Sequence, residues 1–212
     1  MKHRRATGTL LSAVCLAALA TGAAHAEGTT PAAADSARAP AAAAQAAANE
    51  ADAQFVTMMI PHHYQALVMS RLAPTRSTDD AVLALAERID VEQDLEIYMM
   101  QSWQGWHDLT VTDAEQAYQR LLQNPEMLER MGMATPAEID TLGASSGTAF
   151  DVQYLTLMIE HHQGAVRMLR DVIINGSDET LRQWATDMLT TQKTQIAQME
   201  AMLADKTPTG TT

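Results

Sequence analysis

Apolar side chains recur at helical spacing in four stretches of the chain, and no stretch has the alternating pattern of a β-strand. The first predicted helix begins near Asn49, a good N-cap residue, and ends before Pro74. The second covers about 79–104, the third ends at Asn175–Gly176, and the fourth follows directly. This pattern predicts an all-α protein.

The first and third helices carry the same pattern, offset by 99 residues. Residues 54–71 read QFVTMMIPHHYQALVMSR, and residues 153–170 read QYLTLMIEHHQGAVRMLR. The match runs without a gap from 52–103 to 151–202, which indicates an internal duplication of a two-helix unit. Two such hairpins bury their apolar stripes only against each other. We therefore expect a four-helix bundle, with a helical crossover over 105–147 joining the two halves.

The two ends of the chain have the composition of segments outside the folded domain. Lys2, Arg4 and Arg5 precede the apolar run 10–20, and Ala24-His25-Ala26 is a small-x-small cleavage site. We expect a signal peptide at 1–26, a disordered Ala- and Pro-rich tether at 27–48, the duplicated domain at 49–205 and a disordered tail at 206–212. The mature protein is then periplasmic or secreted.

Composition narrows the partners and the chemistry. The only cysteine, Cys15, leaves with the predicted signal peptide, so the mature chain has no disulfide or thiolate metal site. Loss of Lys2, Arg4 and Arg5 lowers the formal net charge from −12 to about −15. Such an acidic surface argues against nucleic acid and anionic membranes as partners and favours cations. The sequence identifies no protein partner.

Candidate metal ligands gather on the two repeated units. Imidazole and thioether without thiolate are typical of Cu(I) sites, for which silver is a mimic. Copper(II) held by histidine with water or a carboxylate, and zinc held by histidine alone, stay open as alternatives. Imidazole must be neutral to bind, so we expect binding to weaken as the pH falls through about 6. The candidate ligands are His62, His63, His161, His162, Met59, Met158, Met69, Met168, Met100 and Met199.

These motifs resemble those of secreted bacterial proteins in the "domain of unknown function 305" family. The resemblance is carried by Ile60-Pro61-His62-His63, by the stretch from Met158 to Ala165, and by the second-helix residues Gln93, Ile97, Met100, Gln192, Ile196 and Met199. It covers about 50–204 and implies a ferritin-like fold. Some related periplasmic members bind copper, which implies copper here by analogy.

Two other functions compete with copper sequestration or carriage. The histidines can belong to a buried polar network of a structural or interaction domain, with Gln93 or Gln192 as hydrogen-bond partner. A di-iron enzyme of the ferritin-like type needs Glu-x-x-His motifs, and the chain has none, so we expect no enzyme. Methionine itself is a common core residue, and Met127, Met131 and Met133 in the link are either packing residues or a loose copper-loading patch.

Overall fold

The computed structural model describes residues 47–207, which contain eight helices and no strand. The helices are α1 (Glu50–Ser70), α2 (Ala73–Arg76), α3 (Asp80–Trp106), α4 (Ala114–Leu121), α5 (Pro125–Met131), α6 (Pro136–Ala144), α7 (Gly147–Asn175) and α8 (Glu179–Lys206). The prediction of an all-α protein is therefore confirmed. The predicted signal peptide, Cys15 and nearly all of the predicted tether lie outside the described residues.

Side-chain caps set where the long helices begin. Asn49 and Asp52 form a reciprocal capping box at the start of α1. Asp79 accepts from the first backbone amides of α3, and Asp178 does the same for α8. Helix α1 ends at Ser70, before Pro74 as predicted, and Pro74 lies within the separate short helix α2. Proline is tolerated there because the first amides of a helix have no intrahelical partner.

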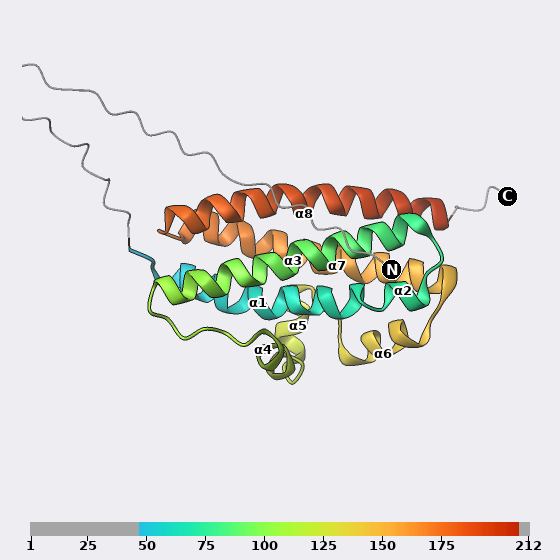
Figure 1. Ribbon diagram of the computed structural model, residues 1–212, viewed down its shortest axis with the longest axis horizontal. Helices are drawn as coiled ribbons and strands as arrows, with labels where there is room; N and C mark the ends of the chain where they lie inside the picture. Colours follow the sequence, from blue (N-terminus) through green and yellow to red (C-terminus); the bar gives the residue numbers. More distant parts are fainter. Residues whose placement is uncertain (1–46, 208–212) are drawn as a thin grey trace, which may run out of the picture. The chain divides into compact units, whose positions relative to one another are not determined.

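The four long helices lie side by side as two hairpins (Figure 1). Helix α1 packs on α3, α7 packs on α8, and the contact between α1 and α7 joins the hairpins. The link between the hairpins is itself helical, with α4 packed on α1 and with α5 and α6 packed on α7. Within the described residues, no helix has both the length and the apolar character needed to cross a bilayer.

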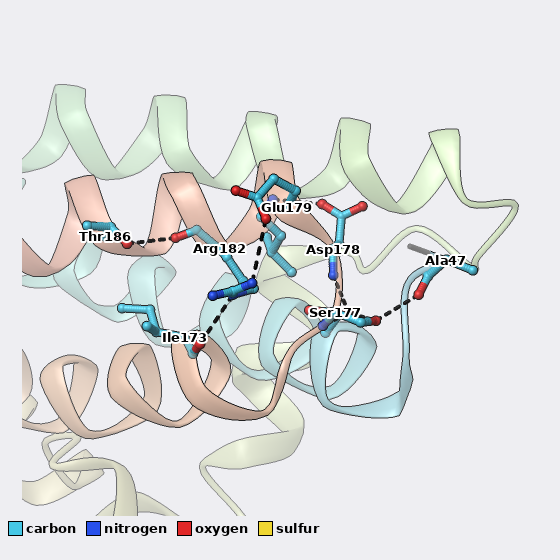
Figure 2. Close-up of polar contacts among 9 residues, drawn as sticks. Ala47, Ile173, Ser177, Asp178, Glu179, Arg182 and Thr186 are labelled. Carbon is cyan, nitrogen blue, oxygen red and sulfur yellow. Dashed lines mark hydrogen bonds and ion pairs between the residues drawn. The ribbon is translucent and has the colours of Figure 1, made fainter. Parts of the chain in front are cut away.

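Each histidine-bearing helix fixes the turn of the opposite hairpin. In α1, Asp52 Oδ2 accepts from the backbone amides of Ser177 and Asp178 at 2.9 and 3.0 Å. In α7, Asp151 Oδ1 accepts from Ser77 Oγ at 2.6 Å. Figure 2 shows the turn between α7 and α8, where Ser177 Oγ also donates to the carbonyl oxygen of Ala47 at 2.7 Å. These bonds fix the register of α1 against α7.

Gly176 ends α7 as the sequence predicts, but for a different reason than a left-handed cap. Its φ is −71°, an angle open to any residue. A Cβ at this position would collide with Asp52 Oδ1 and with the carbonyl oxygen of Val172. Glycine is required here because α1 approaches the turn closely.

Two apolar clusters fill the space between the long helices, and the histidine pairs lie between them along α1 and α7. On α1, Phe55 and Met59 belong to one cluster and Met69 to the other. On α7 the order is reversed, with Met158 before the histidines and Leu169 after them. The histidines therefore form a polar layer between the two apolar clusters.

Candidate metal site

All four paired histidines are fully buried between α1 and α7. The rings of His62 and His161, which occupy the same position in the two repeats, lie 3.7 Å apart between centroids and are tilted by 31°. His63 lies 6.1 Å from His62, and His162 lies 6.0 Å from His161. The duplication thus brings the inner histidine of each pair into direct contact.

Backbone carbonyls fix the protonation of the two inner histidines. His161 Nε2 lies 2.8 Å from the carbonyl oxygen of His62, and His62 Nε2 lies 3.1 Å from that of Met131. A carbonyl oxygen only accepts, so each Nε2 must carry the hydrogen. In a neutral imidazole the other nitrogen, Nδ1, then carries a free lone pair.

The outer histidines reach the same state through side chains of the neighbouring helices. His63 Nε2 donates to Glu96 Oε2 of α3 at 2.7 Å. His162 Nε2 donates to Gln195 Oε1 of α8 at 2.8 Å, and the Gln195 amide is oriented by its own donation to Glu92 Oε2 at 2.7 Å. Every Nε2 thus donates its hydrogen to an oxygen acceptor, and every Nδ1 is left with a free lone pair.

These four Nδ1 atoms are buried, and none has a hydrogen-bond partner within the described part of the chain. A buried acceptor without a partner costs about 1–3 kcal/mol. A histidine metal ligand usually donates one ring N–H to a protein acceptor, which fixes the tautomer and leaves the lone pair of the other ring nitrogen for the metal. The histidines therefore fit a metal ion in donor type and tautomer.

Burial also keeps the rings of His62, His161 and His162 neutral. Desolvation lowers the pKa of His62 and of His161 well below the usual value of 6.5. For His162, desolvation lowers the pKa to about 4, although the bond to Gln195 acts in the opposite direction. The expectation that binding weakens near pH 6 rested on the ordinary histidine pKa, and burial lowers that pKa for His62, His161 and His162.

The candidate methionines lie in three different places in the structure. Met59 and Met100 pack in the core cluster on one side of the histidines, and Met69, Met158 and Met199 pack in the cluster on the other side. All five are fully buried. Met168 is only partly buried and lines an open groove between α1, α5 and α7. No group of three or more His, Cys, Asp or Glu side chains within residues 47–207 is arranged to hold a metal ion.

The expectation that Gln93 or Gln192 pairs with a histidine is wrong. Both side-chain polar atoms of Gln93, and Oε1 of Gln192, are buried without a partner in the described chain. The actual partners are Glu96 and Gln195, three residues further along α3 and α8. Each partner lies 33 residues after its histidine, and Glu96 and Gln195 are themselves 99 residues apart. The repeat offset could therefore have identified them as a matching pair.

Glu92 and Glu96 also connect the buried histidines to the surface. Both line a cavity of about 200 Å³ between α3 and α8. Glu96 keeps 18% of its side chain exposed, whereas His63 behind it has none. The seam between α3 and α8 is therefore where polar groups lead from solvent to the histidine layer.

Comparison with known proteins finds one protein family whose sequence profile matches most of the described chain. The sequence profile described as "Domain of unknown function (DUF305)" matches residues 52–203. No curated protein shows a significant match to the chain.

Several solved structures are similar over the same region. A DUF305 protein from Streptomyces coelicolor, described as a candidate secreted protein, is 32% identical, with a TM-score of 0.64 over 74% of this chain and 93% of its own. A DUF305 fragment from Deinococcus radiodurans is 30% identical, with a TM-score of 0.66 over 74% of this chain and 98% of its own. CopM in its Cu(I)-bound form is 26% identical, with a TM-score of 0.57 over 73% of this chain and 96% of its own.

Proposed function

Because the chain belongs to the DUF305 family, we propose that it is an exported copper-binding protein that sequesters or carries Cu(I). The observation that carries this proposal is the set of four buried Nδ1 lone pairs on His62, His63, His161 and His162. Each is held in a ligand-ready tautomer by a hydrogen bond at Nε2.

The neighbouring methionines would supply softer donors to the same ion. Met59 lies three residues before His62 and four before His63 on α1, so the three side chains lie on neighbouring turns. Met158 has the same relation to His161 and His162 on α7. Cu(I) prefers thioether and imidazole over oxygen ligands and accepts a low coordination number. A Cu(I) site of histidine and methionine ligands therefore does not require three neighbouring His, Cys, Asp or Glu side chains.

The contact between the inner histidines supports one shared centre over two separate ones. His62 and His161 lie with ring centroids 3.7 Å apart, on opposite sides of the interface between repeats. A cation bound by one of these rings is within reach of the other. We therefore place the copper in the histidine layer, with ligands from both repeats.

Similarity to CopM supports the choice of metal. CopM structures include Cu(I)-bound, Cu(II)-bound and silver-bound forms, at 26–27% identity to this chain. Cu(I) and silver are the ions expected for imidazole with thioether. The predicted signal peptide and the similarity to the Streptomyces protein support export, and the four paired long helices support a ferritin-like four-helix bundle.

Copper titration of untagged mature protein tests the proposal. Replacement of His62, His63, His161 and His162 by leucine should remove copper binding from the histidine layer, while circular dichroism remains helical. Met59→Leu with Met158→Leu keeps side-chain volume nearly constant and tests the sulfur atoms alone. Retention of copper at parental affinity by the fourfold histidine variant would show that the histidines are not the ligands.

A structural role for the histidines is the second candidate. It is favoured by the hydrogen bond that each Nε2 already makes within the protein. In that case the parent binds no copper at the histidine layer, and the leucine variants change only the stability of the fold. Metal analysis of the parent protein therefore separates the two candidates directly.

A further inference from the structure

Methionine side chains line an open groove on the side of the molecule where α5 packs on α7. The groove has a volume of about 340 Å³ and lies between α1, α5 and α7. Met58 comes from α1, Met127 and Met131 from α5, and Met168 from α7. Four methionines from three different helices thus line one groove.

Methionine is concentrated here far beyond its share of the chain. The cluster beneath the groove has eleven residues, and five are methionine, whereas the whole chain has 14 in 212 residues. Met58, Met127 and Met168 are only partly buried, so their sulfur atoms are not simply filling gaps in a closed core. Solvent-accessible thioethers are also open to oxidation, a disadvantage that ordinary packing would avoid with leucine.

We propose that this methionine groove is a second metal site, which binds Cu(I), or Ag(I) as its mimic, through thioether sulfur. Thioethers are soft, neutral donors, and the groove contains no cysteine or histidine. Arg130 and Arg167 also line it, with Asp171 as the single acidic residue. Two positive charges oppose a divalent ion more strongly than a monovalent one. The groove therefore selects monovalent soft ions over Cu(II) and zinc.

The groove is physically joined to the histidine layer through Met131. Its side chain lines the groove, and its carbonyl oxygen accepts the hydrogen of His62 Nε2 at 3.1 Å. The backbone beyond it is held by Gln65, whose side chain makes two hydrogen bonds to Ala134, at 2.7 and 2.8 Å. The groove thus serves as a loading site at the surface, one residue away from the buried ligands. Its role in loading, but not its binding of soft ions, rests on the proposed function.

The groove has no counterpart in the second repeat. Met58 corresponds to Leu157, and α5 belongs to the link, which occurs once. The groove therefore adds one soft-ion site per chain, separate from the shared histidine centre.

Titration of mature protein with Ag(I) in chloride-free buffer tests the site, with isotope-labelled methionine methyl groups observed by NMR. The methyl signals of Met58, Met127, Met131 and Met168 should shift together in the fourfold histidine variant, which lacks the other site. Replacing these four methionines by leucine should remove one Ag(I) equivalent per chain from the parent protein. A matched pair of changes outside the groove, Met99→Leu and Met202→Leu, should remove none.

The outcomes separate this site from the proposed function. If the histidine variant loses all Ag(I) binding, or if the four groove methyl signals do not move, the groove is not a metal site, whatever the parent does. If the histidine layer binds no copper while these signals still shift, the proposed function fails and the groove stands. Equal binding of Cu(II) and Ag(I) in the groove would overturn the inferred selectivity.

Discussion

His161 donates a 2.8 Å hydrogen bond to the carbonyl oxygen of His62, its own counterpart 99 residues earlier. The reciprocal bond is not made, because His62 donates instead to Met131 at the end of α5. The link therefore breaks the symmetry of the duplication at the centre of the candidate site. Gln65 and Gly164 occupy the same position in the two repeats, and they contact the link in different ways. Gln65 binds Ala134 by its side chain, whereas Gly164 leaves room for the Met131 carbonyl.

Replacement of Gly164 by alanine should destabilise the protein despite the higher helix propensity of alanine. A Cβ at position 164 would overlap the carbonyl oxygen of Met131. The overlap involves backbone on both sides, so we expect a loss of about 1–3 kcal/mol in the free energy of unfolding. Urea denaturation measures it. Gly143→Ala is the control, because a Cβ there meets nothing within 4 Å, and it should be neutral or stabilising. Equal effects at both positions would contradict the tight contact.

Lys206 should stabilise the contact of the C-terminal end of α8 with the N-terminal ends of α3 and α7. Its Nζ lies 2.6 Å from Asp79 Oδ2 and 3.2 Å from Asp151 Oδ2, and Asp151 is buried. Lys206→Met keeps the aliphatic stem but leaves the Asp151 carboxylate without its cation. We expect a loss of about 1–2 kcal/mol, below the range for fully buried pairs because Lys206 and Asp79 are partly exposed. Thermal unfolding at low and high salt measures it, and an unchanged midpoint would contradict this role.

His107 occupies the position of Lys206 in the first repeat. Its Nε2 lies 3.4 Å from Asp178 Oδ2, and its ring packs 4.3 Å from that of Trp103. From the sequence, His107 is predicted to be a surface or loop residue, because a single histidine after a helix carries no pattern. Both residues pair with the N-cap aspartate of the opposite hairpin, His107 with Asp178 and Lys206 with Asp79.

The fold was largely predictable because helical periodicity and the duplication are both local patterns in the sequence. The predicted cap Asn49 and the predicted span 79–104 placed the starts of α1 and α3 within a residue of those observed. The partners of the histidines were not predictable in the same way. Gln93 and Glu96 lie one turn apart on α3, and the rotation of that helix about its axis decides which one faces His63. That rotation depends on packing between helices, which periodicity does not specify. The role of Met131 was also not predictable, because any residue type can supply the backbone carbonyl oxygen that accepts from His62.

Acid should destabilise the metal-free protein, in part through His162. Burial lowers its pKa from 6.5 to about 4, so the unfolded chain binds a proton over this range that the folded chain does not. The contribution to stability is therefore complete above about pH 6.5 and is lost as the pH falls towards 4. The shift corresponds to about 3 kcal/mol. His162→Gln should flatten the pH dependence of the unfolding free energy between pH 4 and 6.5, as measured by urea denaturation of metal-free samples. A parallel profile for the parent and the variant would show that His162 is not held neutral.

The two repeats offer a matched test of the residues that hold the histidines. Glu96 accepts from His63 in the first repeat, and Gln195 accepts from His162 at the corresponding place in the second. Glu96→Gln therefore copies a pairing that the protein already uses, and copper affinity should stay close to that of the parent. Glu96→Leu removes the acceptor and frees His63 to rotate or to change tautomer. The loss of such a supporting hydrogen bond typically weakens metal binding about 10–100-fold.

Competition titrations with a Cu(I) chelator measure these affinities, and circular dichroism confirms that each variant stays folded. If the leucine and glutamine variants bind copper equally well, orientation of His63 by residue 96 does not contribute to the site. If both lose affinity equally, the negative charge of Glu96 matters and its role as acceptor does not. Only a loss confined to Glu96→Leu supports a ligand set in which the protein holds Nε2 and presents Nδ1 to the metal.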